Sequence, residues 1–106
     1  MATRIPDVER SVYGGTQRRY RFLNGYGASV VCHQYSYGGD DGLWELAVLD
    51  RDGYLTYDTP ITDDVLGWLT EDAVEEKLTA ISKLPDAPPV RLLPAISKLL
   101  DAPPVR

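Results

Sequence analysis

The chain has 106 residues, of which 43% are hydrophobic and 25% are charged, and its formal net charge is −5 at pH 7. This length allows one domain with one core, and this composition is that of a folded rather than a disordered protein. No run of about 20 apolar residues is present, so we expect neither a membrane-spanning helix nor a signal peptide. A single cysteine, Cys32, excludes an internal disulfide and fits a reducing cytoplasm.

The charges are distributed unevenly along the chain. Residues 1–39 carry five arginines and two acids, residues 40–76 carry twelve acids and one arginine, and residues 77–106 carry five basic groups and two acids. Burying many unpaired carboxylates is costly, so we expect the middle segment to face solvent. It forms either an acidic surface that only aids solubility or one that docks on a basic partner.

The first 17 residues predict a loosely ordered arm, because they contain Pro6 and Gly14-Gly15 and show little periodicity. Regular structure is expected only after this arm. We therefore divide the chain into the arm at 1–17, a single α+β domain at 18–85 and a proline-rich tail at 86–106.

A β-hairpin is predicted first in the domain. Residues 18–23 and 28–33 alternate like strands, and Asn24-Gly25 between them is typical of a two-residue type I′ turn. This turn would pair Tyr20 with Ser29. In that register, one face of the sheet carries Tyr20, Phe22 and Val31.

A second hairpin is predicted from two further strands. Residues 43–49 alternate clearly, residues 50–53 (Asp-Arg-Asp-Gly) are typical of a type I turn, and residues 54–58 return as a strand. This pairing would place four apolar side chains together on one face: Leu46, Val48, Leu55 and Tyr57.

Two helices are predicted after the strands. Thr62 suits a helix N-cap, and Asp63 and Asp64 follow in the first turn, where the helix dipole favours carboxylates. Thr70 begins a second helix in the same way, and Pro85 ends it. Its apolar stripe consists of Val74, Leu78, Ile81 and Leu84.

The sequence thus predicts an α+β fold: a four-stranded antiparallel β-meander followed by two C-terminal helices packed on one face. Residues 80–91 recur almost unchanged at 95–106, with Leu100 in place of Pro85. Two copies do not make a solenoid, so the second copy is either a short docking helix or a duplication without function. The predicted core consists of Trp44, Leu46, Val48, Leu55, Tyr57, Leu66, Trp68, Val74, Leu78 and Ile81.

Catalytic and ligand-binding motifs are not found in the sequence. It has no phosphate-binding glycine loop, no dinucleotide-binding glycine motif and no nucleophile elbow. Cys32 and His33 are adjacent, so in a strand they would point to opposite faces and form no nucleophilic pair. One cysteine and one histidine also make no zinc site within one chain. We therefore expect no cofactor, no metal and no enzymatic activity.

Direct binding of nucleic acid is not expected either. Arg18, Arg19 and Arg21 stand among aromatic residues, a composition that suits a stacking surface for single strands. Alternation along the strand, however, separates Arg19 and Arg21 from Tyr20 and Phe22. The sequence pI of about 4.7 also argues against a general phosphate binder.

Three stretches of the sequence carry a resemblance: RYRFLNGYGASVV at 19–31, GLWELAVLD at 42–50 and LTYDTPIT at 55–62. Together they resemble small uncharacterised proteins of actinobacterial phages and prophages, over residues of about 4 to 85. The resemblance supplies no catalytic residues. It implies a viral accessory protein that works in the host cytoplasm by binding a host protein.

We therefore expect a non-enzymatic accessory protein that binds a host protein through an acidic surface and inhibits it. The expected partner is a nucleic-acid-processing complex or a CRISPR-type immune complex. The alternatives are a homodimeric structural protein and an enzyme that uses the loop at 35–42 with Asp40 or Asp41. The candidate partner-binding residues are Tyr35, Tyr37, Asp40, Asp41, Asp50, Asp52, Asp63 and Asp64.

Overall fold

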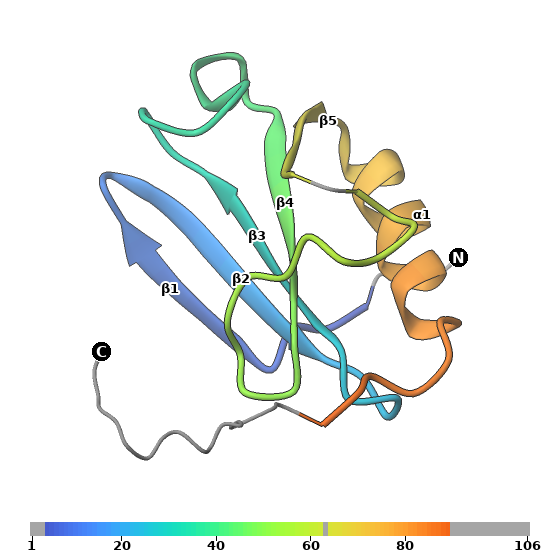
Figure 1. Cartoon of the computed structure of the whole chain (residues 1–106). Helices are drawn as coiled ribbons and strands as arrows, with labels where there is room; N and C mark the ends of the chain where they lie inside the picture. The colour runs from blue at the N-terminus through green and yellow to red at the C-terminus, as the bar shows by residue number, and fades with distance from the viewer. Residues whose placement is uncertain (1–3, 63, 90–106) are drawn as a thin grey trace, which may run out of the picture.

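The computed structural model describes residues 4–62 and 64–89 as a five-stranded antiparallel sheet with one helix on one face (Figure 1). The strands lie in chain order across the sheet, so it is a simple meander. The prediction of four strands and two C-terminal helices is therefore wrong, although the α+β class is consistent with the structure. The elements are β1 (Val8–Val12), β2 (Gly15–Arg21), β3 (Gly27–Cys32), the 3-10 turn η1 (Gly39–Asp41), β4 (Trp44–Leu49), β5 (Leu66–Leu69) and α1 (Glu71–Ser82).

Strand β1 lies in the segment that was expected to be a loose arm. It pairs with β2 from Val8 opposite Arg19 to Val12 opposite Gly15. β1 is an edge strand and four of its five residues are exposed, so its sequence lacks the alternation of apolar residues that marks a half-buried strand. The expected start of regular structure near Arg18 is therefore wrong.

Strands β2 and β3 overlap the two predicted strands, but their register differs. Tyr20 pairs with Ala28, one residue earlier than predicted. The connecting loop has three residues, 23–25, instead of two: the Phe22 amide donates to the Tyr26 carbonyl (2.8 Å), and the Gly25 amide donates to the Phe22 carbonyl (3.0 Å). A shift of one residue exchanges the two faces of a strand. Val30, instead of Val31, therefore shares the buried face of the sheet with Tyr20 and Phe22.

The turn after β4 forms as predicted, but the strand that returns from it soon leaves the sheet. Leu49 bridges to Leu55, whereas Leu46 pairs with Leu66. The chain between Leu55 and Leu66 therefore loops out from the edge of β4. As a result Leu55 and Tyr57 are about half exposed and do not join the core as predicted.

The first predicted helix does not form, because β5 (Leu66–Leu69) occupies the second half of its segment. The Thr62 hydroxyl accepts a hydrogen bond from the Asp64 amide (3.0 Å), which closes a local turn and not a helix. Trp68 is exposed and has a positive φ of 59°, so its predicted place in the core is also wrong. Asp63 lies outside the described residues.

Helix α1 forms as predicted and covers one face of the sheet (Figure 1). The Thr70 hydroxyl caps it by accepting a hydrogen bond from the Ala73 amide (3.1 Å). The core between helix and sheet contains Tyr20, Phe22, Ala28, Val30, Trp44, Leu46, Val48, Val74, Leu78 and Ile81. Leu66 and Leu84 pack against its edge.

Two further expectations concern a membrane-spanning helix and the duplicated C-terminal segment. α1 has 12 residues, and no helix in the described part of the chain has the length and apolar character needed to cross a bilayer. The duplicated segment at 95–106, with its proposed docking helix, lies outside the described residues.

The Asn24 side chain joins the β2–β3 turn to the end of α1. Its amide nitrogen donates to the carbonyls of Ile81 (2.8 Å) and Leu84 (3.0 Å), and its carbonyl accepts from the Tyr26 amide (3.0 Å). The last carbonyls of a helix have no partner within the helix, so Asn24 caps α1 from a distant part of the chain.

Replacing Asn24 with alanine should lower the free energy of unfolding by about 1–3 kcal/mol, because buried carbonyls lose their donor. Urea denaturation measures this difference. Asn24→Asp keeps the shape of the side chain, but a carboxylate cannot donate a hydrogen bond, so this variant should be destabilised at least as much as Asn24→Ala. A urea midpoint of Asn24→Asp equal to that of the parent protein would contradict the capping role.

Candidate functional site

The β1–β2 turn, the β3–β4 loop and β5 lie toward one end of the sheet (Figure 1), and four exposed aromatic side chains belong to these segments. Tyr13 is 66% exposed, Tyr35 71%, Tyr37 60% and Trp68 61%. Asp40 and Asp41 are exposed in η1, within the same loop. We call this surface the loop end; its residues are Tyr13, His33, Tyr35, Tyr37, Asp40, Asp41 and Trp68.

Contacts between the three segments hold them together at this end of the sheet. The Tyr13 ring lies edge-to-face against the rings of His33 and Tyr35, with centroid distances of 5.1 and 5.3 Å. On the β5 side, the Trp68 amide donates to the Tyr37 carbonyl (3.2 Å). The β3–β4 loop therefore connects the tip of the β1–β2 hairpin to β5.

The backbone is strained at two of these aromatic residues. Tyr13 has φ of 48° and Trp68 has φ of 59°, and no other non-glycine residue in the described part of the chain has a positive φ. The left-handed region is rare for bulky side chains and costs roughly 1–2 kcal/mol per residue. Strain of this kind concentrates at functional sites.

The β3–β4 loop is held in shape by its own hydrogen bonds. The Ser36 hydroxyl donates to the His33 carbonyl (2.9 Å) and accepts from the His33 amide (2.9 Å). The Tyr37 amide donates to the Glu45 carboxylate (2.8 Å). Gly38 and Gly42, both left-handed, flank η1. These contacts fix the loop backbone that carries the aromatic and acidic side chains, which lowers the entropic cost of binding.

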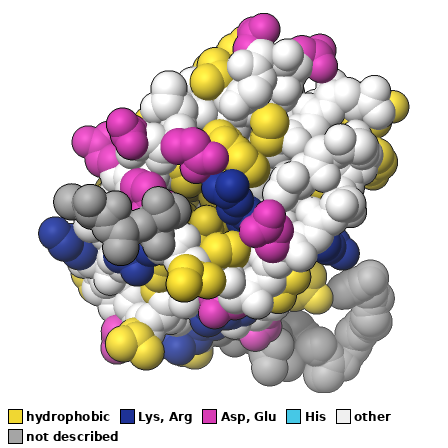
Figure 2. All heavy atoms as spheres, turned by 180° about the vertical axis from the view of Figure 1, so that it is seen from behind, with side chains coloured by type: hydrophobic (Ala, Val, Ile, Leu, Met, Phe, Trp, Pro, Cys, Tyr) yellow, Lys and Arg dark blue, Asp and Glu magenta, His cyan; other side chains and the backbone are white. Residues whose placement is uncertain are grey.

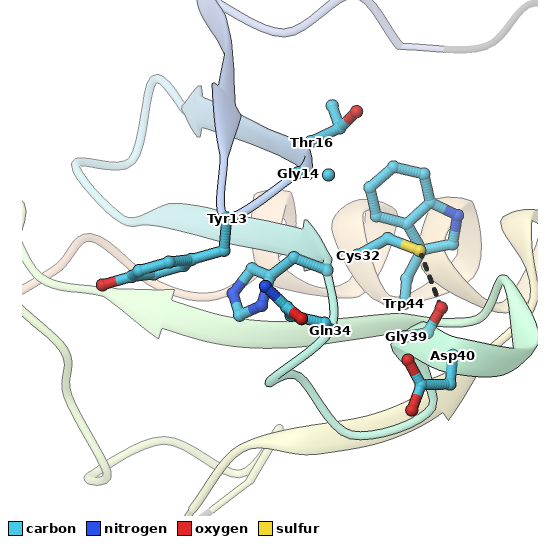
Figure 3. A pocket seen from close by; sticks show the side chains of 10 residues that line it. Tyr13, Gly14, Thr16, Cys32, Gln34, Gly39, Asp40 and Trp44 are labelled. Carbon is cyan, nitrogen blue, oxygen red and sulfur yellow. Dashed lines mark hydrogen bonds between the residues drawn. The ribbon is translucent and has the colours of Figure 1, made fainter.

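An open pocket of about 580 Å³ lies between the β1–β2 turn and the β3–β4 loop (Figure 3). The Cys32 thiol donates to the Gly39 carbonyl across its floor (3.7 Å). Among the described residues, no lysine or arginine lines the pocket, and Asp40 is its one carboxylate. The side chains that shape it include Tyr13, Cys32, His33, Gln34, Asp40 and Trp44.

The structure separates the eight predicted site residues. Tyr35, Tyr37, Asp40 and Asp41 lie together at the loop end, whereas Asp50 and Asp52 lie in the turn at the opposite end of β4. Exposed Asp64 precedes β5, and nothing is described for Asp63.

Asp50 has a structural role in its turn, since its carboxylate accepts from the amides of Asp52 (2.9 Å) and Tyr54 (3.0 Å). The acidic side chains do not form one continuous surface either. Figure 2 shows them in separate groups, one of which lies over α1 and another at the loop end at the top of the view. The acidic side chains of the described residues therefore do not make up a single docking face.

Sequence reasoning did not identify Tyr13 or Trp68 as site residues, and it assigned Trp68 to the core. Tyr13 precedes Gly14-Gly15, a pair typical of turns, so an exposed aromatic at a hairpin tip could have been suspected there. Trp68 has no such local signal, because its exposure depends on the pairing of β5 with β4.

The ionisable groups with shifted pKa values lie on the helix side of the sheet. Burial acts to lower the pKa of Arg18, but the hydrogen bond and the charge of Glu71 raise that pKa above its ordinary value. The Arg18 guanidinium lies 3.1 Å from the Glu71 carboxylate and 4.2 Å from the centre of the Trp44 ring. Burial raises the pKa of Tyr20. These groups join α1 to the sheet and have a structural role.

The chemistry of the loop end is therefore that of exposed rings and carboxylates around a pocket. Among residues 4–62 and 64–89, no three His, Cys, Asp or Glu side chains are placed to hold a metal ion together.

Comparison with protein families, curated proteins and solved structures finds no match to this chain.

Proposed function

We propose that this protein has no catalytic activity of its own and binds another protein through the loop end. The observation that carries the proposal is the gathering of four exposed aromatic side chains from three segments, two of them on strained backbone. Tyrosine and tryptophan are enriched in protein interfaces and account for much of their binding energy.

The charge of the loop end favours a partner with a basic surface. Asp40 and Asp41 are exposed, and the one ion pair within the described residues, Arg18 with Glu71, lies elsewhere. Carboxylates at the rim of an interface speed association with a positively charged partner, and their effect weakens as salt rises.

In its narrower form, the proposal places the protein in the cytoplasm of a phage-infected bacterium. There it would bind and inhibit a host protein such as a nucleic-acid-processing or CRISPR-type immune complex. The resemblance to phage accessory proteins supports this form. So does chemistry, because proteins that bind nucleic acid carry basic surfaces, which are complementary to the carboxylates of the loop end.

A capture experiment with matched tyrosine variants tests the proposal. The full-length protein is immobilised and exposed to an actinobacterial lysate, and bound proteins are quantified by mass spectrometry. Tyr35→Ala should reduce retention of a specific partner at least about tenfold, the effect of losing an interface hot spot. Tyr54→Ala is the control, since Tyr54 is also 71% exposed but follows the turn at the other end of β4.

If the loop end makes the contact, Tyr35→Ala loses retention of the partner and Tyr54→Ala keeps it. Equal retention by Tyr35→Ala and Tyr54→Ala would contradict the proposed surface. A second measurement at low and at high salt should show partner retention falling as salt rises, because Asp40 and Asp41 contribute long-range attraction.

A further inference from the structure

We infer that the pocket of the loop end receives a cationic side chain, arginine or lysine, from the partner protein. This inference rests on the proposed function and adds the chemistry that the partner must present. It is drawn from three features of the pocket as the described residues form it: its aromatic wall, its carboxylate and its lack of any lysine or arginine.

The aromatic wall consists of Tyr13 and His33, which line the pocket, and the Tyr35 ring lies against both of them outside the lining. Their ring centroids lie 5.1, 5.3 and 6.2 Å apart, and every pair is edge-to-face. Tyr13 and Tyr35 are each more than three-fifths exposed, so much of their ring surface is open to a ligand. A cation within about 6 Å of a tyrosine ring face is attracted by the negative charge density there.

Asp40 supplies the negative charge on the other side of the pocket. Asp40 and Tyr13 both line the pocket, and in Figure 3 they lie on opposite sides of Gln34. A guanidinium would gain a charge-assisted hydrogen bond from the carboxylate and a cation–π contact from the ring.

The protein already holds one of its own guanidiniums in this way. Arg18 lies 4.2 Å from the centre of the Trp44 ring and 3.1 Å from the Glu71 carboxylate. That combination of ring, carboxylate and guanidinium is complete within the chain. At the loop end, Tyr13 and Asp40 provide the ring and the carboxylate, and the guanidinium is the group that a partner would supply.

A titration with two peptides tests the inference directly. The full-length protein, labelled with nitrogen-15, is titrated to millimolar concentration with a glycine–arginine peptide or with the same peptide containing citrulline, which has the shape of arginine without its charge. The arginine peptide should cause saturable shifts in the amide signals of Gly14, Gln34 and Gly39, and the citrulline peptide should not. Equal shifts with both peptides, or shifts confined to other parts of the sheet, would overturn the inference.

Variants separate the pocket from general electrostatics. Asp40→Asn should weaken binding of the arginine peptide several-fold more than Asp41→Asn, because both side chains are exposed but Asp40 alone lines the pocket. Tyr13→Gly removes the ring and relieves the positive φ, so it should weaken binding without lowering the unfolding midpoint. An equal effect of the two asparagine variants would count against the pocket.

The result also distinguishes the inference from the proposed function. If Tyr35→Ala loses the lysate partner while the arginine peptide fails to bind, the loop end is an interface but the pocket takes no cation. If the arginine peptide binds as expected while Tyr35→Ala keeps the partner, the pocket takes a cationic side chain but the proposed protein-binding surface is wrong.

Discussion

Replacing Leu46 with alanine should lower the free energy of unfolding by about 2–5 kcal/mol, because the substitution leaves a cavity in a closed core. Leu46 is fully buried, on the central part of the sheet between Val30 of β3 and Leu66 of β5. Urea denaturation followed by tryptophan fluorescence measures the change.

Leu23 provides a matched control for this substitution. Its side chain is fully exposed in the β2–β3 turn, so Leu23→Ala should change the free energy of unfolding by no more than about 0.5 kcal/mol. Similar midpoints for the two variants would contradict the position of Leu46 in the core, and with it the register that pairs β3 with β4.

Helix α1 could be predicted from the sequence because its signals are local. The Thr70 cap, the acids of the first turn and the apolar stripe lie within one stretch of chain, and each favours the same helix. The register of the β2–β3 hairpin could not be predicted in the same way. Asn24-Gly25 suits a two-residue turn, but Asn24 instead reaches the carbonyls of Ile81 and Leu84, which are distant in sequence.

The segment before α1 shows the opposite case, in which local signals misled. Thr62 and the acids after it look like a helix start, and a short apolar run such as 65–69 fits a helix or a strand equally well by periodicity. Pairing with β4 decides in favour of a strand, and that pairing brings together residues far apart in the chain. Around Thr62 the structure instead has a local turn, in which the Thr62 hydroxyl accepts a hydrogen bond from the Asp64 amide.

The candidate site likewise contains residues that the sequence indicated and residues that it did not. The β3–β4 loop concentrates Tyr35, Tyr37, Asp40 and Asp41 in one short stretch, so the sequence alone indicated it as a place for contact. The contribution of Tyr13 depends on β1, which the sequence did not indicate. Its ring reaches His33 and Tyr35 only because β1 and β2 form a hairpin whose tip lies beside the loop.

The conformation of the β3–β4 loop is itself open to test through Gly39. Gly39→Ala should abolish partner capture and arginine-peptide binding, because a Cβ atom there would clash with the His33 carbonyl and lie only 2.6 Å from the Ser36 hydroxyl oxygen. The loop would have to open, which separates Tyr35 and Asp40 from the Tyr13 side of the pocket. We expect an accompanying loss of about 1–3 kcal/mol in the free energy of unfolding, as for other overpacked sites.

Gly42→Ala is the matched control, since Gly42 lies in the same loop but a Cβ atom there would meet nothing within 4 Å. Its φ of 75° makes alanine strained by roughly 1–2 kcal/mol, so the two variants should lose similar stability. Binding should separate them, because only Gly39→Ala displaces the loop that carries the contact residues. Retention of the partner by Gly39→Ala at the level of Gly42→Ala would mean that the shape of this loop does not determine binding, and the exposed rings of Tyr13 and Trp68 would then have to make the contact without it.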